Sequence, residues 1–220
     1  MPHAERGAAR SSSPTLVIAT MNRGKFREFS ELLADLPMRL KSLAEFPGAP
    51  AVREDADTYL ANAVNKAVSI ARWSHCAVLA DDSGLEVDAL GGAPGVHSAR
   101  YAGERQDSQA NVGKLLGALN GIALQRRGAR FRCVIVVACP DGATLTAEGA
   151  CEGYISEMPR GSHGFGYDPV FVDHPSGLTF AEMPAERKHQ VSHRARACRM
   201  LRRTLLEFLR AHLAESKAQG

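Results

Sequence analysis

One short apolar segment constrains the fold of this chain more than any other. Residues 77–80 form an apolar run typical of a buried strand, and two adjacent carboxylates, Asp81 and Asp82, follow directly, with Ser83 and Gly84 behind them. In α/β proteins the C-terminal ends of such strands usually carry the functional groups. Paired carboxylates suit Mg²⁺, which usually binds one or two carboxylates together with substrate phosphates. The pattern therefore predicts a buried strand with a metal site at its C-terminal end.

Helix and strand patterns alternate around this segment. Residues 15–20 read as a strand, and a polar loop leads from it into a helix that ends before Pro37. A second helix is expected from Asp57 or Thr58, because both are good N-caps. Its apolar face is predicted to consist of Leu60, Val64, Ala67 and Ala71. Asn62 and Lys66 are predicted to lie together on a second face.

The second half of the chain predicts a helix over residues 107–119 and two strands, over 130–138 and 144–152, joined by a tight turn. Such a hairpin is antiparallel, so the sheet is expected to be mixed. From Ser192 we expect one long helix. Its inward residues are predicted to be Cys198, Leu201, Leu205, Phe208 and Leu209. Its outward residues are predicted to be Arg196, Arg199, Arg202, Arg203 and Arg210. The fold class is α/β, a single domain over residues 14–214 with a central mixed sheet flanked by helices, after a disordered tail over residues 1–13.

Composition fits one globular domain. Of 220 residues 45% are hydrophobic, and the net charge of +3 falls short of the dense basic face of a nucleic-acid binder. The five cysteines are odd in number and form no Cys-x-x-Cys pair, which indicates a reducing compartment. No apolar run reaches the roughly 18 residues of a membrane span, and the first residues lack a signal-peptide core. We expect a cytoplasmic protein with no nucleic-acid or membrane partner.

The loop between the first strand and its helix is a candidate anion site. It reads Thr20-Met21-Asn22-Arg23-Gly24-Lys25. Free N–H groups at a helix N-terminus, a glycine that permits close approach and a lysine together can cradle an anion. The loop is not a Walker A motif, and taken alone such a loop is more often a turn with a solvated lysine.

Acidic residues form the second candidate group. Because adjacent strand residues point to opposite faces, Asp81 and Asp82 are expected to have different roles, with only one a direct metal ligand. Glu54, Asp55 and Asp57 precede the second helix, where capping and compensation of the helix dipole account for most such clusters. One of these carboxylates could still reach the metal if the loop folds over the end of the strand.

Two later segments complete the candidates. Phe165 lies between glycines in residues 164–169, and an aromatic ring left unshielded in this way can stack on a flat ligand such as a base. A core position is the alternative for Phe165 and the better interpretation for Tyr167. Lys188 and the segment 192–194 stand at the start of the last helix, where a lone His-Arg pair is usually on the surface.

Taken together and in this order, these segments closely resemble the inosine triphosphate pyrophosphatase family, also called Ham1-like or RdgB-like. The resemblance covers about residues 15–210 and is strongest from Asp81-Asp82-Ser83-Gly84-Leu85 to Ser98-Ala99-Arg100-Tyr101. It implies an elongated α/β fold, a homodimer, a Mg²⁺ cofactor and hydrolysis of non-canonical purine nucleoside triphosphates (ITP, dITP, XTP) to the monophosphate and pyrophosphate.

The resemblance also implies residue roles. Asp82 matches the catalytic carboxylate and a metal ligand, and Glu54 matches the second metal carboxylate, with Asp55 still possible because the family often has two glutamates there. The remaining matches are to substrate-binding positions. They are Thr20, Asn22, Arg23, Gly24, Lys25 and Lys66 for the triphosphate, Ser83 as a substrate contact, and Phe165, Gly166, Tyr167, Asp168, Lys188, His193 and Arg194 for the base.

Two other functions compete with this one. A related Maf-like pyrophosphatase would share the fold class and the metal chemistry, although the segments 165–168 and 192–194 argue against it. A nucleotide- or RNA-binding module would rest on the arginines of the last helix, which are explained more simply as the solvated face of an amphipathic helix.

Overall fold

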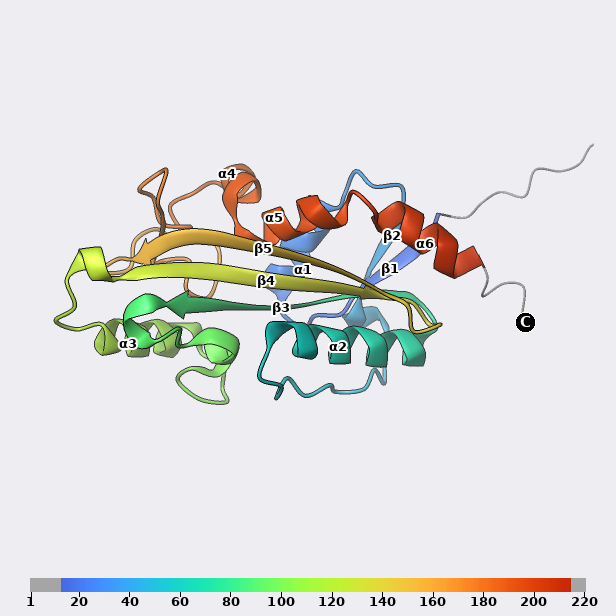
Figure 1. Ribbon diagram of the computed structural model, residues 1–220, viewed down its shortest axis with the longest axis horizontal. Helices are drawn as coiled ribbons and strands as arrows, with labels where there is room; N and C mark the ends of the chain where they lie inside the picture. The colour runs from blue at the N-terminus through green and yellow to red at the C-terminus, as the bar shows by residue number, and fades with distance from the viewer. Residues whose placement is uncertain (1–12, 215–220) are drawn as a thin grey trace, which may run out of the picture.

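The computed structural model describes residues 13–214 as one α/β domain (Figure 1). The predicted tail, residues 1–13, lies outside this range apart from Ser13. The strands are β1 Thr15–Ile18, β2 Arg39–Ser42, β3 Ala77–Val87, β4 Gly128–Ala138, β5 Thr144–Ile155 and β6 Phe171–Asp173. The helices are α1 Arg23–Leu32, α2 Tyr59–Ser74, α3 Ser108–Ala118, α4 Ala185–Val191, α5 His193–Leu201 and α6 Leu205–Ala214, with a 3₁₀ helix at Gly95–Arg100.

The sheet is mixed, as predicted, and its strand order is β2-β1-β3-β4-β5-β6. β1 is parallel to both β2 and β3. The pairs β3–β4, β4–β5 and β5–β6 are antiparallel. Figure 1 shows the long strands β3, β4 and β5 running through the length of the molecule, with α2 and α3 on one face and α5 on the other. The shape is therefore elongated along these strands.

The position predicted for the acidic pair is wrong. β3 does not end at Ala80 but continues through Asp81, Asp82 and Ser83 to Val87, paired with β4 from Val78 to Val87. Long-range pairing with the β4–β5 hairpin thus outweighs the local polarity of these residues. β1, in contrast, pairs only as far as Leu79, so the acidic pair lies where β3 extends beyond its parallel neighbour.

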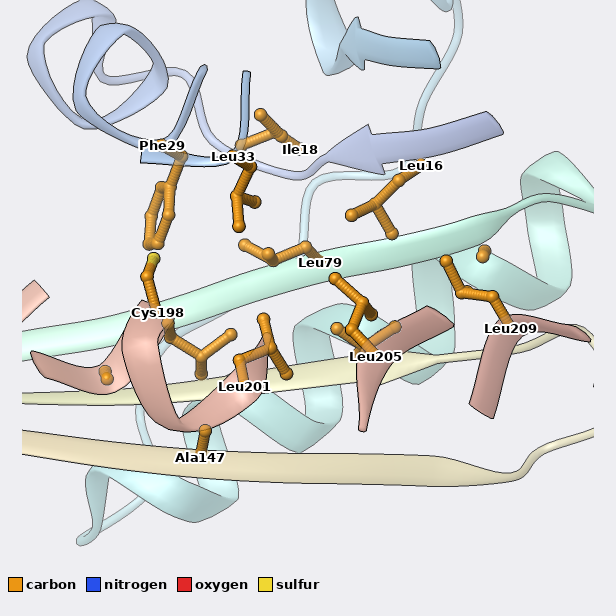
Figure 2. Packing of buried hydrophobic residues seen from close by; sticks show 14 of the residues in the cluster. Leu16, Ile18, Phe29, Leu33, Leu79, Ala147, Cys198, Leu201, Leu205 and Leu209 are labelled. Carbon is orange, nitrogen blue, oxygen red and sulfur yellow. The ribbon is translucent and has the colours of Figure 1, made fainter. Parts of the chain in front are cut away.

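Alternating residues of β1 and β3 face two of the three hydrophobic cores in residues 13–214. On one face Leu16, Ile18 and Leu79 pack against α1, α5 and α6, which supply the side chains that surround them in Figure 2. On the other face Val17 and Val78 pack against the alanine-rich side of α2. This period of two is the ordinary consequence of strand geometry and places successive residues of β3 against different helices.

α2 begins after Thr58, whose side chain accepts a hydrogen bond from the N–H of Ala61, so one of the two predicted caps is correct. Its predicted apolar face is only partly right, because Leu60 is 44% exposed and Val64 half-buried. Ala67 and Ala71 are buried as predicted, and the buried side also includes Tyr59, Asn62, Ala63 and Ile70. Because alanines are small, the helix lies close to the sheet on this side. Asn62 is on the same side and is therefore buried as well.

The predicted single C-terminal helix is two helices, α5 and α6, separated at residues 202–204. Arg202 donates from Nη1 to the carbonyl oxygen of Leu32 at 2.9 Å and pairs with Asp35, which ties the break to the end of α1. The inward residues are buried as predicted, except that Phe208 is partly exposed. Within the described residues, no helix is long and apolar enough to cross a membrane.

Candidate active site

A cleft of about 150 Å³ opens beside the part of β3 that extends beyond β1. It brings together most of the predicted site, from segments far apart in sequence. The predicted residues that line it are Asn22, Lys25, Glu54, Asp82, Ser83, Phe165, Gly166, Tyr167, Asp168, Lys188, His193 and Arg194. It is also lined by residues that sequence reasoning did not select, among them Val96, Arg100, Gln106, Ser108, Asn111 and Phe131.

Four predicted residues do not line the cleft. Thr20 accepts a hydrogen bond from the N–H of Asn22 at 3.2 Å and so shapes the loop from behind. Gly24 lies under the ring of Phe165, where a Cβ atom would come within 2.5 Å of the ring. Lys66 pairs with Glu54 behind the lining, and Arg23 is exposed.

The loop before α1 places a lysine at one end of the cleft. Asn22 caps α1 by accepting the N–H of Lys25 at 3.0 Å. The ammonium group of Lys25 lies 2.9 Å from Asp81 Oδ2. Burial alone would lower the pKa of Lys25, but the charge of Asp81 raises it above its ordinary value, so the lysine stays protonated. The alternative of a merely solvated lysine is therefore wrong.

Asp81 and Asp82 point to opposite faces of β3, as predicted. Asp81 accepts from Ser83 Oγ at 2.5 Å and faces Lys25 and Arg194. Burial works to raise the pKa of Asp81, but these two cations overcome it and hold the pKa well below its ordinary value. Asp81 is thus a permanently ionised anchor for the cations beside it.

Asp82 faces α2 and the open cleft. Asn62 donates from Nδ2 to its Oδ2 at 2.9 Å, and the side-chain oxygen Oδ1 accepts the N–H of Ser83. Burial raises the pKa of Asp82, with further increases from the charges of Glu54 and Asp81, against the opposing charge of Lys25. The two neighbouring carboxylates therefore have pKa values shifted in opposite directions.

Glu54 and Asp82 are the residues that fit a divalent cation. Glu54 lines the cleft, whereas Asp55 is exposed and is not among the lining residues. The negative charge of Glu54 helps to raise the pKa of Asp82, and a bound cation would offset the repulsion between the two carboxylates. Within residues 13–214 no group of three or more histidine, cysteine or acidic residues could hold a metal alone. The donor set suits Mg²⁺, which commonly takes its other ligands from phosphates and water.

A buried network of charges contributes Lys188, Asp168 and Arg194 to the lining of the cleft. The ammonium group of Lys188 lies 2.5 Å from Asp168 Oδ2 and 2.7 Å from Glu28 Oε1, and Glu28 also pairs with Arg194. Burial works to raise the pKa of Glu28, but Arg194 and Lys188 lower it below its ordinary value. Sequence reasoning missed Glu28. The available signal was its spacing of three residues from Lys25, which puts both on one side of α1.

Aromatic rings surround this network. Phe165 is half-buried, with its ring centre 5.0 Å from the ammonium group of Lys188. His193 stacks on Phe131 with ring centres 4.6 Å apart, and burial, together with the nearby cations, holds its pKa well below 6.5, so it is neutral. His193 and Arg194 are buried, which contradicts the surface alternative. Tyr167 is a core residue, as predicted.

Several buried polar atoms in this region have no hydrogen-bond partner among the described residues. They include His193 Nδ1, Arg194 Nε and Asp81 Oδ1. Unsatisfied buried groups cost free energy and are uncommon in folded proteins, except where a ligand, ion or water completes them. Fold and cleft together define an α/β protein of the class that binds an anionic, phosphate-bearing ligand with a flat apolar part.

Comparison with known proteins identifies the family. The model of the Ham1 family matches residues 16–204. A dITP/XTP pyrophosphatase of Shouchella clausii is 52% identical over 190 residues, which cover 86% of this chain and 96% of the relative. One of Geobacillus kaustophilus is 53% identical over 182 residues, covering 83% and 89%. The solved structure of a HAM1 protein from Coxiella burnetii is 38% identical, with a TM-score of 0.80 over 88% of this chain and 99% of that one. This chain belongs to the Ham1 family.

Proposed function

We propose that this protein hydrolyses non-canonical purine nucleoside triphosphates (ITP, dITP and XTP) to the nucleoside monophosphate and pyrophosphate. The observation that carries the proposal is the lining of one cleft, which combines Lys25, Glu54 and Asp82 with Phe165, His193 and Arg194. We assign the first three residues to the phosphate end of the substrate and the last three to its base end. The relatives named dITP/XTP pyrophosphatase support the same substrates.

At the carboxylate end, water attacks the α-phosphorus and pyrophosphate leaves. Asp82 is the proposed general base, because its carboxylate lines the cleft beside Glu54 and can accept a proton from a water bound there. Lys25, which lines the cleft, neutralises charge on the leaving pyrophosphate, and Lys66 acts through its ion pair with Glu54. A Mg²⁺ ion held by Glu54 and Asp82 would supply Lewis-acid stabilisation of the phosphoryl oxygens. Catalysis of this kind is mainly positional and electrostatic.

At the aromatic end, hydrogen-bond donors would select the base. Arg194 carries an unpartnered Nε–H, and neutral His193 can donate from one ring nitrogen. These donors suit the 6-oxo oxygen of hypoxanthine or xanthine. Adenine presents an amino donor at that position, so donor would face donor and binding would be weakened. Phe165 stacks on the base plane.

The test is pyrophosphate release from ITP, XTP, GTP and ATP with and without Mg²⁺. We expect Mg²⁺-dependent turnover of ITP and XTP well above that of GTP and ATP, and its loss in Asp82→Asn. Asp55→Asn, which removes the same charge from an exposed neighbour of Glu54, is the matched control and should keep activity. Turnover that survives Asp82→Asn would refute the role of Asp82. A wild-type protein inactive on all four purines would refute the substrate class and direct the assay to Maf-like substrates.

We further propose that the protein acts as a homodimer in the reducing cytoplasm. The described cysteines, Cys76, Cys133, Cys139, Cys151 and Cys198, are all unpaired, which supports a reducing compartment. Light scattering during size-exclusion chromatography checks the oligomeric state. A monomeric mass at micromolar concentration would refute the dimer.

A further inference from the structure

The cleft contains one charged side chain to which neither the motifs nor the resemblance gave a role. Arg100 ends the 3₁₀ helix Gly95–Arg100 and lines the cleft together with Lys25, Glu54 and Asp82. We propose that Arg100 is a further catalytic residue, whose guanidinium binds the phosphates of the substrate and fixes the loop that carries Glu54. The inference rests on the proposed function and adds a residue to its phosphate end.

Arg100 differs from the other lysines and arginines of the cleft in its partners. Lys25 is paired with Asp81, Lys188 with two carboxylates, and Arg194 with Glu28. In residues 13–214 no carboxylate forms an ion pair with Arg100. A polyanion that binds the other cations must compete with their carboxylates. The guanidinium of Arg100 can bind the polyanion without first giving up an ion pair to a carboxylate.

The guanidinium of Arg100 already holds the loop of the metal carboxylate. Its Nη2 donates to the backbone carbonyl oxygen of Glu54 at 2.8 Å and lies 3.2 Å from His97 Nδ1. Its Nη1 and Nε make no hydrogen bond to the described residues. A guanidinium is a planar fork with five N–H donors, so one edge can hold the carbonyl while another binds phosphate oxygens. Phosphate binding and the placement of Glu54 are thereby coupled.

The backbone on both sides of Arg100 is fixed by one side chain of α3. Asn111 donates from Nδ2 to the carbonyl oxygen of Ala99 at 2.9 Å, and its Oδ1 accepts the N–H of Ala102 at 2.6 Å. The side chain of Arg100 therefore starts from a fixed point beside the cleft. Such preorganisation reduces the entropy lost when the ligand binds.

The experiment compares Arg100→Ala and Arg100→Lys with the wild type. Inorganic pyrophosphate and inosine serve as competitive inhibitors, because the first probes the phosphate end and the second the base end. In Arg100→Ala we expect pyrophosphate inhibition to weaken about 10- to 100-fold, as for loss of charge-assisted hydrogen bonds, and kcat/KM for ITP to fall with it. Inosine inhibition should not change. Arg100→Lys should recover part of the pyrophosphate affinity but less of kcat, since an ammonium group lacks the planar fork that holds the Glu54 carbonyl on one edge and phosphate oxygens on another.

Arg105→Ala is the matched control, because Arg105 is exposed, lies close in sequence and is not among the lining residues. Arg105→Ala should leave kcat, KM and the inhibition by pyrophosphate and inosine unchanged. A folded Arg100→Ala or Arg100→Lys protein with wild-type kcat, KM and pyrophosphate inhibition would overturn the inference. So would an equal loss in Arg105→Ala or a parallel loss of inosine inhibition. If the wild type turns over no purine triphosphate, the proposed function fails, and pyrophosphate binding, measured by calorimetry, still tests Arg100.

Discussion

Gly149 controls how closely α5 approaches the sheet. This glycine lies within β5, and a Cβ atom there would be 2.3 Å from the carbonyl oxygen of His193 and 2.4 Å from the backbone nitrogen of Ala197. Both contacts are with backbone atoms of α5, so no side-chain rotation relieves them. Gly149→Ala therefore requires α5 to move away from β5, and His193 and Arg194 to move with it.

The size of the movement follows from these distances. Ordinary contact begins at 3.4 Å, so α5 must shift by roughly 1 Å. Overpacking of this kind costs about 1–3 kcal/mol in the free energy of unfolding. A displacement of about 1 Å at a positioned group can cost on the order of 100-fold in rate. We expect both effects in Gly149→Ala, with the rate effect on ITP turnover the larger.

Urea denaturation and the pyrophosphate-release assay measure the two effects. Gly113→Ala is the control, because Gly113 is in α3 and a Cβ atom there meets nothing within 4 Å. That substitution should increase the free energy of unfolding by up to about 1 kcal/mol and leave kcat/KM unchanged. Wild-type stability together with wild-type kcat/KM in Gly149→Ala would refute the reasoning.

Two further predictions concern buried charge. Glu28→Gln removes the carboxylate between Lys188 and Arg194 and should lower the free energy of unfolding in urea by about 3 kcal/mol. Glu31→Gln, on the exposed side of α1, should lose under about 1 kcal/mol, and equal losses would contradict the prediction. The pKa of His193 lies well below 6.5, so below pH 6.5 the unfolded chain binds a proton that the folded one does not. Between pH 7 and pH 5.5 the free energy of unfolding should fall by up to about 1.4 kcal/mol, and His193→Gln should lack this part of the urea-measured pH dependence. Identical pH profiles would argue against a buried neutral imidazole.

Features set by short-range patterns could be predicted from the sequence. The turn at residues 140–142 predicted the hairpin and hence the mixed sheet, and Thr58, one of two predicted caps, accepts the N–H of Ala61 at the start of α2. Asp82 and Phe165 were candidates because paired acids and an aromatic residue between glycines are unusual in a core, whereas Glu54, Lys188, His193 and Arg194 were assigned by the resemblance to the family. These signals depend only on neighbours in the chain.

Features set by distant contacts could not be predicted in this way. The polar stretch from Asp81 belongs to β3 because β4 pairs with it, and the break before α6 is held by Arg202 on the end of α1. Glu28 looked like one solvated acid of an amphipathic helix, since its partners lie 160 and 166 residues further along the chain. No local pattern contains such pairings.

α1 contributes to both proposed parts of the site, and this limits how substrate preference can change. Asn22 and Lys25 at its first turn belong to the proposed phosphate site, while Glu28, one turn later, pairs with Lys188 and Arg194 of the proposed base pocket. A helix is stiff over such a distance, so a shift that retunes one end also disturbs the other. Divergence toward a different base would therefore accumulate in residues 164–168 and at the start of α5, leaving α1 unchanged.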